Sequence, residues 1–130
     1  MKKSNDPTPL RPQGERLLNA NLVEIDLNKY IQQIKDEVTW KESDLNSITL
    51  FKSDSMRIVL IGIHQHATIK PHQTNAVISV QVLEGEINFK TDEGEHILNK
   101  GNMITLQPKI QHSVDAIQES FFLLTTVPTA

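Results

Sequence analysis

Cysteine is absent from this 130-residue chain, which excludes disulfide bonds, thiolate metal ligands and cysteine nucleophiles. Long hydrophobic runs are absent too, because the longest mostly apolar stretch, residues 58–63, is far too short to span a bilayer. No apolar segment follows Lys2 and Lys3, so we expect no signal peptide. We therefore expect a cytoplasmic protein with no membrane partner.

Charge of one sign is not concentrated anywhere in the sequence. The net charge is −3, and acidic and basic residues are scattered along the chain. Without a basic block or an alternation of basic and aromatic residues, we expect no nucleic-acid partner. Glycine is sparse, and the five glycines form neither a phosphate-binding loop nor a Gly-x-Ser-x-Gly elbow. The sequence therefore gives no support to P-loop nucleotide chemistry or serine-hydrolase chemistry.

The length fits a single domain, preceded by a segment of different composition. Residues 1–20 contain Pro7, Pro9 and Pro12 and little apolar content, which predicts an extended or flexible arm. Plain disorder and an arm that packs on the barrel or on a partner both fit this composition.

Residues 21–46 are predicted to form an N-terminal strand and helix segment. Leu27, Tyr30, Ile31 and Ile34 follow helical spacing, and Asp26 is well placed to be the N-cap. We expect one short amphipathic helix whose apolar stripe contacts the core.

The remaining residues, 47–130, have the sequence pattern of an all-β domain. Short β-branched and apolar runs alternate with turn signals, which is typical of a sandwich or barrel. The expected strands cover residues 48–51, 56–63, 76–83, 87–90, 95–98, 103–106, 112–117 and 120–127.

Two of these strands are apolar on both faces. In residues 56–63 and 76–83, apolar side chains occupy both alternating positions, so the outer face also needs a cover. A second copy of the chain would supply one, and we therefore expect a homodimer. An outer face covered by the N-terminal helix is the competing explanation.

Two motifs in the region from His66 to Ala116 resemble those of the cupin superfamily. The first ends in the hairpin Val82-Leu83-Glu84-Gly85-Glu86, and the second has Gly101, Pro108 and His112 at the turn glycine, loop proline and last metal histidine. Asn102 replaces the more common aspartate of that second motif. The resemblance implies a single cupin barrel, that is, a double-stranded β-helix or jelly roll.

The resemblance also assigns the metal-ligand positions of a cupin. Counted back from Gly85, the two histidine positions fall on His72 and Thr74, and the glutamate position falls on Ile78. The chain thus keeps His72 and His112 of the four ligands. An imidazole and carboxylate site suits zinc, iron, manganese or nickel, but threonine is a poor ligand and isoleucine cannot ligate.

The other histidines do not fit the motif. His64-Gln65-His66 has the His-x-His pattern but lies eight residues out of register, and Lys70 and Pro71 occupy the positions where its glutamate should follow. We interpret it as a strand end entering a loop. His96 lies beside a turn and is expected to be a solvated strand residue.

The resemblance and strand periodicity together predict the lining of a pocket. If the glutamate position points inward, alternate residues of the same strand do so as well. The predicted pocket residues are Thr74, Ile78, Val80, Val82, Ile104, Leu106 and Val114. This largely apolar lining would suit a small organic ligand. It is equally consistent with a barrel whose interior is filled by its own side chains.

Two functions remain open at this point. The first is a stand-alone cupin that binds or senses a small molecule, with two titratable imidazoles at the mouth of the barrel. The second is a metal-dependent enzyme, an oxygenase, isomerase or decarboxylase of small organic acids. The depleted ligand set favours the binding module, although the fold alone does not choose.

Overall fold

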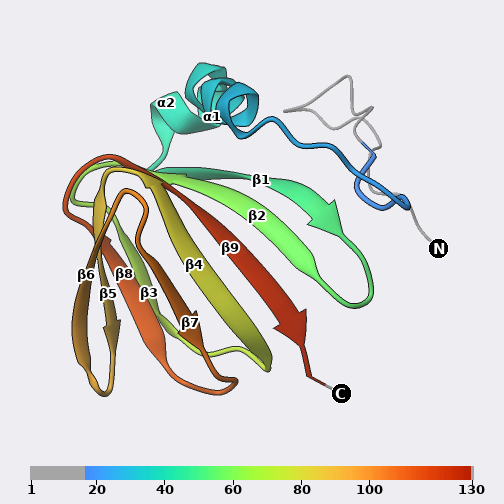
Figure 1. The fold of residues 1–130 in the computed structure, drawn as a ribbon. Helices are drawn as coiled ribbons and strands as arrows, with labels where there is room; N and C mark the ends of the chain where they lie inside the picture. Colours follow the sequence, from blue (N-terminus) through green and yellow to red (C-terminus); the bar gives the residue numbers. More distant parts are fainter. Residues whose placement is uncertain (1–16, 130) are drawn as a thin grey trace.

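Two antiparallel sheets make up most of the molecule in the computed structural model, which describes residues 17–129 (Figure 1). The five-stranded sheet has the order β1 (Leu45–Lys52), β2 (Arg57–Ile63), β9 (Ser120–Pro128), β4 (Ala76–Glu84) and β7 (Met103–Leu106). The four-stranded sheet has the order β3 (Thr68–His72), β8 (His112–Ala116), β5 (Glu86–Thr91) and β6 (Gly94–Asn99).

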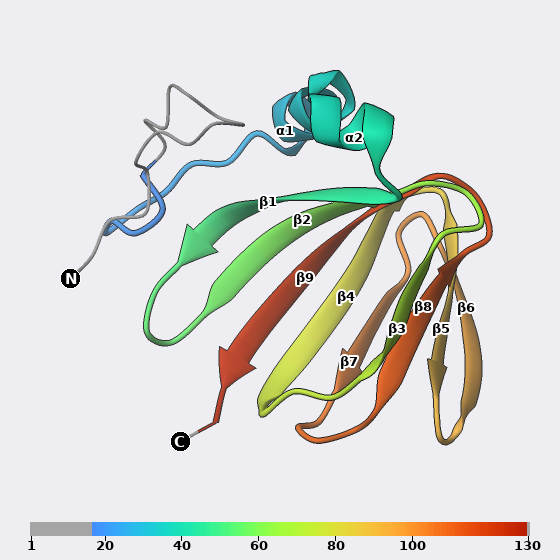
Figure 2. The ribbon, with the colours of Figure 1, turned by 180° about the vertical axis from the view of Figure 1, so that it is seen from behind.

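The two sheets face each other and enclose one hydrophobic core (Figure 2). The chain crosses between the sheets at β2–β3, β3–β4, β4–β5, β6–β7, β7–β8 and β8–β9, the path of a jelly roll. The predicted all-β cupin barrel is therefore confirmed. Most of the predicted arm lies outside the described residues. At its end, however, Leu18 is buried and its carbonyl oxygen accepts a hydrogen bond from the Lys52 N–H at 2.9 Å.

Strand β3 was not predicted, and its composition explains why. It contains Lys70, Pro71 and His72, which read as a polar loop. Proline is tolerated at a sheet edge or in a bulge because it has no N–H to donate. Strand β3 lies at the edge of its sheet, and its register with β8 shifts between Ile69 and His72.

The barrel core is built from alternating residues of both sheets. In β4 the burial pattern strictly alternates from Ala76 to Val82, so one face of the strand points inward. The buried residues of this core are Ile63, Ala76, Ile78, Val80, Val82, Ile87, Phe89, Leu98, Val114, Ala116 and Phe122.

Two helices cover part of the outer face of the five-stranded sheet. Helix α1 (Leu27–Asp36) has the predicted N-cap, since the Asp26 carboxylate accepts from the Lys29 N–H at 3.3 Å. A second helix, α2 (Val38–Glu42), follows it and places Trp40 in the core. Between these helices and the sheet lies a second hydrophobic cluster. Its buried residues are Ile31, Ile34, Trp40, Ile48, Leu50, Leu60 and Phe121. The predicted helix cover therefore exists over β1 and β2.

The turn between β4 and β5 depends on Gly85. Its φ of +94° lies in the region that favours glycine. A Cβ atom there would lie 2.3 Å from the Glu119 carbonyl oxygen and 2.3 Å from the Ser120 Oγ. That hydroxyl oxygen accepts a hydrogen bond from the Glu86 N–H at 2.9 Å. The β4–β5 and β8–β9 connections therefore meet at a point with no room for a side chain.

Within residues 17–129, neither helix is long and apolar enough to cross a membrane. The cytoplasmic location stays a prediction.

Candidate functional site

The structure brings His72 and His112 together from positions forty residues apart in sequence. His72 ends β3 and His112 begins β8, and the two are direct partners across the antiparallel pair. Cross-strand partners point to the same face of a sheet. Their ring centroids are 4.3 Å apart, with the planes tilted by 58°. We call these two side chains the histidine pair.

Each member of the histidine pair has one ring nitrogen held by the backbone. The Nδ1 of His72 lies 3.0 Å from the Lys70 carbonyl oxygen, and the Nδ1 of His112 lies 2.9 Å from that of Ile110. A carbonyl oxygen only accepts, so each Nδ1 carries the hydrogen and donates it. In a neutral imidazole the lone pair is then on Nε2. The pair thus presents two Nε2 acceptors.

His112 is the buried member. Its exposed fraction is 6%, and its ring stacks on Phe89 with a centroid distance of 5.5 Å and an angle of 11°. Burial lowers the pKa of His112 below its ordinary value. The hydrogen bond to Ile110 opposes this pKa shift, and the charge of a protonated His72 adds to it. Burial therefore favours the neutral form of His112.

This pKa shift predicts that the protein loses stability on mild acidification. A histidine whose pKa is lowered by folding stabilises the native state above its ordinary pKa of 6.5, and that contribution is lost as the pH falls below this value. The loss should be smaller in His112→Gln, as urea unfolding at pH 7.5 and pH 5 will show. His96→Gln is the control, because His96 is exposed. An unchanged pH dependence in His112→Gln would refute the assignment.

The remaining predicted pocket residues lie on the inner wall in two zones. Ile78, Val80, Val82 and Val114 are buried in the barrel core. Ile104 and Leu106 of β7 are half-buried against that core. The deep part of the barrel is thus packed by side chains, and solvent reaches the wall beside β7.

Thr74 lies in the loop between β3 and β4, at the same mouth. Its backbone holds the site together, because its carbonyl oxygen accepts from the Lys109 N–H at 2.8 Å. That bond ties the loop after His72 to the loop before His112. Lys109 has a φ of +67°, in the left-handed region, so this loop has a defined and strained conformation.

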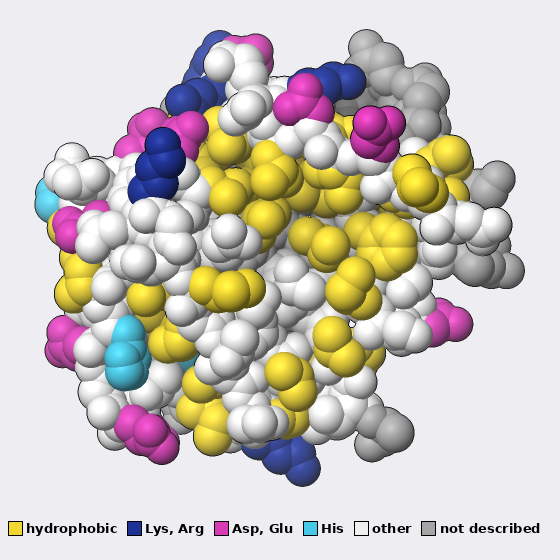
Figure 3. All heavy atoms as spheres, viewed as in Figure 1, with side chains coloured by type: hydrophobic (Ala, Val, Ile, Leu, Met, Phe, Trp, Pro, Cys, Tyr) yellow, Lys and Arg dark blue, Asp and Glu magenta, His cyan; other side chains and the backbone are white. Residues whose placement is uncertain are grey.

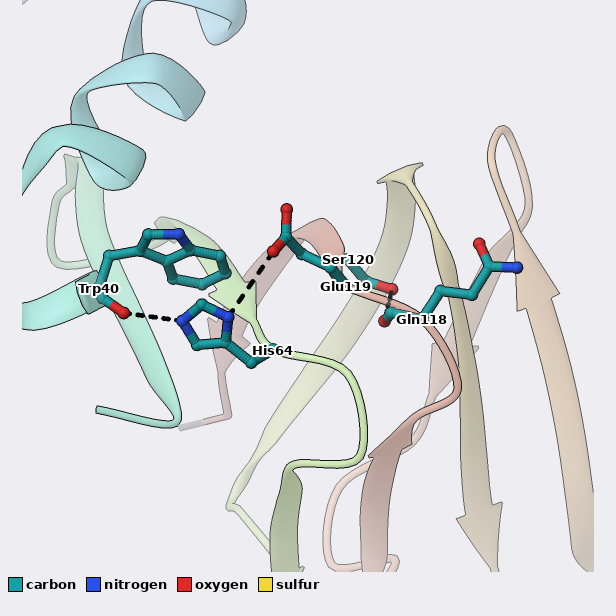
Figure 4. Close-up of polar contacts among 5 residues, drawn as sticks. All are labelled: Trp40, His64, Gln118, Glu119 and Ser120. Atoms are coloured by element: carbon teal, nitrogen blue, oxygen red, sulfur yellow. Dashed lines mark hydrogen bonds and ion pairs between the residues drawn. The ribbon is translucent and has the colours of Figure 1, made fainter. Parts of the chain in front are cut away.

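His64 does not join the pair. Its ring stacks on Trp40 at a centroid distance of 3.6 Å, and its Nε2 lies 2.7 Å from the Trp40 carbonyl oxygen. Its Nδ1 lies 3.6 Å from a carboxylate oxygen of Glu119. Figure 4 shows this contact between the end of β2, helix α2 and the turn before β9, where Ser120 Oγ also donates to the Gln118 carbonyl oxygen.

The donor set does not fit the metal centre that the cupin resemblance implies. Between residues 17 and 129, no group of three or more histidine, aspartate or glutamate side chains is placed to hold a metal ion. Two imidazoles fall short of the three protein ligands of a catalytic site. His66 and His96 are exposed, His66 in a turn and His96 on β6.

Some features of the site were missed by sequence reasoning. Phe89 contacts His112, and it could have been found because it shares the inward parity of Ile87 in the predicted strand 87–90. The role of the Lys70 and Ile110 carbonyl oxygens could not have been predicted. Every residue has a carbonyl group, and only the course of the loop directs these two toward the Nδ1 atoms of the histidine pair.

Comparison with known proteins places the chain in a family. The model of the AraC-like ligand binding domain matches residues 57–127, more than half of the chain. The chain belongs to the AraC-like ligand binding domain family. This family has a cupin-type domain, so the predicted cupin superfamily membership is confirmed. No match was found among curated protein sequences.

Solved structures of the same fold are numerous. TT1209 from Thermus thermophilus matches with a TM-score of 0.69 and 20% identity, over 82% of this chain and 98% of that one. A cupin superfamily protein from Desulfitobacterium hafniense matches with a TM-score of 0.66 and 18% identity, over 99% and 100%. The DMSP lyase DddQ from Ruegeria pomeroyi matches with 0.60 and 18%, over 67% and 48%. At these identities the likeness shows the fold alone.

Proposed function

We propose that this AraC-like ligand binding domain is a binding module that holds a small organic molecule at the mouth of its barrel. The histidine pair carries the proposal, because both Nδ1 atoms are engaged by carbonyl oxygens and both Nε2 atoms remain as acceptors. An apolar wall with a few oriented polar groups is the usual composition of a ligand site.

The chemistry of the pair favours a hydroxylated ligand. A neutral imidazole with its hydrogen on Nδ1 accepts at Nε2, so its complement is an O–H donor. A carboxylate ligand would instead need a hydrogen on Nε2, and burial of His112 opposes the extra proton. The half-buried side chains of Ile104 and Leu106 would contact the carbon skeleton. Sugars and small diols have this combination of groups.

A ligand-observed NMR screen tests the proposal. The full chain, treated with chelator, is mixed with a panel of pentoses, hexoses and small diols, and saturation transfer is recorded at pH 7.5. We expect transfer to at least one hydroxylated compound. Transfer to no compound of the panel at millimolar concentration would contradict the proposal.

A metal-dependent cupin enzyme is the second candidate, for which the two Nε2 atoms would supply two of the three protein ligands that a catalytic site needs. An oxygenase, isomerase or decarboxylase acting on a small organic acid would need zinc, iron, manganese or nickel at His72 and His112. Because two imidazoles hold such an ion weakly, we expect calorimetric titration of the chain with Zn²⁺ to give at most micromolar affinity, lost in His72→Ala. Near-stoichiometric metal in protein purified without chelator would reverse the order of the two candidates.

A further inference from the structure

His64, which does not belong to the histidine pair, links three parts of the molecule that are distant in sequence. Its ring, at the end of β2, stacks on the Trp40 indole of α2 at a centroid distance of 3.6 Å and an angle of 25°. Its Nδ1 faces the Glu119 carboxylate, in the turn between β8 and β9, at 3.6 Å. Figure 4 shows the imidazole between α2 and this turn. We call Trp40, His64 and Glu119 the His64 clasp.

Both ring nitrogens of His64 face groups that only accept hydrogen bonds. The Nε2 lies 2.7 Å from the Trp40 carbonyl oxygen, so Nε2 carries a hydrogen and donates it. The neighbour of Nδ1 is a carboxylate oxygen. A second hydrogen on Nδ1 makes this contact an ion pair, whereas a lone pair there would face negative charge. The face of an indole also attracts a cation. All three surroundings therefore favour the imidazolium form of His64.

No cation is placed to oppose this charge. The other titratable or charged residues of the elements around the ring are Lys35, Glu37, Lys41, Glu42, Asp44 and His66. Between residues 17 and 129, the ion pair of His64 is with Glu119 and with none of these. The charge of His64 therefore acts mainly on Glu119 and on the indole.

The backbone of His64 is fixed to the barrel. Its N–H donates to the Asp44 carbonyl oxygen at 3.0 Å, and its carbonyl oxygen accepts from the Ala67 N–H at 3.1 Å. The N–H of His66 donates to the Ala116 carbonyl oxygen of β8 at 2.8 Å. If the contacts of the clasp change, α2 is therefore the part that moves.

Helix α2 depends on its contacts with the rest of the molecule. It has five residues, too few for a helix that is stable alone. Its N-cap, Glu37, makes no capping hydrogen bond with its side chain, and Trp40 packs on Phe121 at a centroid distance of 5.3 Å. Figure 3 shows hydrophobic side chains on the sheet beside the helices. Loosening α2 would therefore enlarge the apolar area that faces solvent there.

We infer that the His64 clasp is a pH-sensitive switch that holds α2 on the barrel when His64 is protonated and loosens it when His64 is neutral. Histidine is the side chain that ordinarily changes charge between pH 5 and 8. The ion pair and the cation–π contact exist only with the charged ring, so they are present at low pH and are lost as the pH rises. Together, two such contacts change an equilibrium about fivefold.

The emission of Trp40 reports on the clasp directly, because the chain contains one tryptophan. Between pH 5 and 9 the emission of the full chain should follow a sigmoidal curve, since a charge on the stacked ring alters the emission of the indole. His64→Gln should abolish this curve, because glutamine can still donate to the Trp40 carbonyl oxygen but carries no charge. His66→Gln is the matched control, an exposed histidine in the same loop, and should keep it. A pH-independent wild type, or an unchanged curve in His64→Gln, would overturn the inference.

Amide exchange tests the movement of α2 itself. The Trp40 N–H, which donates to the Glu37 carbonyl oxygen at 3.1 Å, should lose about fivefold in protection between pH 5.5 and pH 8.5, after correction for the intrinsic exchange rate. The amides of β4 should show no such loss. Local exchange is the right readout because burial of His112 makes the overall stability change with pH in the opposite direction.

Glu119→Gln separates the switch from a merely structural contact. This variant removes the negative charge beside Nδ1 at a half-exposed position, so the barrel should stay folded. Its emission curve should persist with a midpoint at lower pH, and the loss of Trp40 protection should become smaller. A midpoint equal to that of the wild type, or a full loss of protection in His64→Gln, would contradict the inference and assign the pH response of α2 to another group.

Discussion

Replacing Gly85 with alanine is expected to lower the free energy of unfolding by about 3 kcal/mol. A left-handed backbone conformation costs an alanine about 1–2 kcal/mol, and crowding in a packed region adds about 1–3 kcal/mol. The new Cβ would lie 2.3 Å from the Glu119 carbonyl oxygen, and backbone atoms yield less readily than a flexible side chain. The melting temperature should fall by roughly 10 °C.

Gly101 provides the control for this substitution. Its φ of +89° is close to that of Gly85, but a Cβ atom there would meet no heavy atom within 4 Å. Gly101→Ala should therefore cost only the backbone penalty, about 1–2 kcal/mol. Urea unfolding of the two variants measures the difference. Equal losses would mean that the contact between the β4–β5 turn and Glu119 does not constrain the fold.

Removing the histidine pair is expected to weaken ligand binding strongly while the barrel stays folded. Each hydrogen bond from a ligand hydroxyl to an Nε2 contributes about 1 kcal/mol net, or roughly a fivefold change in affinity. The double variant His72→Ala, His112→Ala should therefore bind the sugar or diol selected by the NMR screen at least about 25-fold more weakly. His72→Ala alone should lose about fivefold, with little loss of stability, because His72 is exposed.

His96→Ala is the matched control for the binding loss. This residue is an exposed histidine on the same four-stranded sheet, opposite Phe89 on β5, so its removal tests whether any histidine of the sheet suffices. The affinity of the His96→Ala variant for the sugar or diol should equal that of the wild type in a saturation-transfer titration. Equal affinity of the wild type and the double variant would place the ligand elsewhere on the molecule.

The fold could be predicted because its signals are local and repeated. Alternating burial in β4 appears in the sequence only at its centre, where Ser79 and Gln81 alternate with Ile78, Val80 and Val82. The helix was predictable for the same reason, since Asp26 and the spacing of Ile31 and Ile34 are visible without a structure. Strand β3 was not predicted, because its polar, proline-containing sequence has no strand pattern and it forms a strand by pairing with β8.

The site was only partly predictable, because its chemistry depends on groups that the sequence does not distinguish. The pairing of His72 with His112 followed from the cupin resemblance, and the two are now placed as cross-strand partners. The orientation of their rings follows from the Lys70 and Ile110 carbonyl oxygens, which depend on loop geometry. The role of His64 likewise required the packing of helix α2, which brings Trp40 against its ring.

The protonation of the histidine pair is the most direct test of the proposed site. Long-range ¹H–¹⁵N spectra of chelator-treated, ¹⁵N-histidine-labelled protein at pH 7.5 distinguish the two ring nitrogens. We predict hydrogen on Nδ1 and a free Nε2 for both His72 and His112, with both Nε2 signals shifting when the hydroxylated compound from the screen is added and the His96 signals unchanged. Hydrogen on Nε2 of both rings, or Nε2 signals that move with Zn²⁺ and not with that compound, would contradict the account.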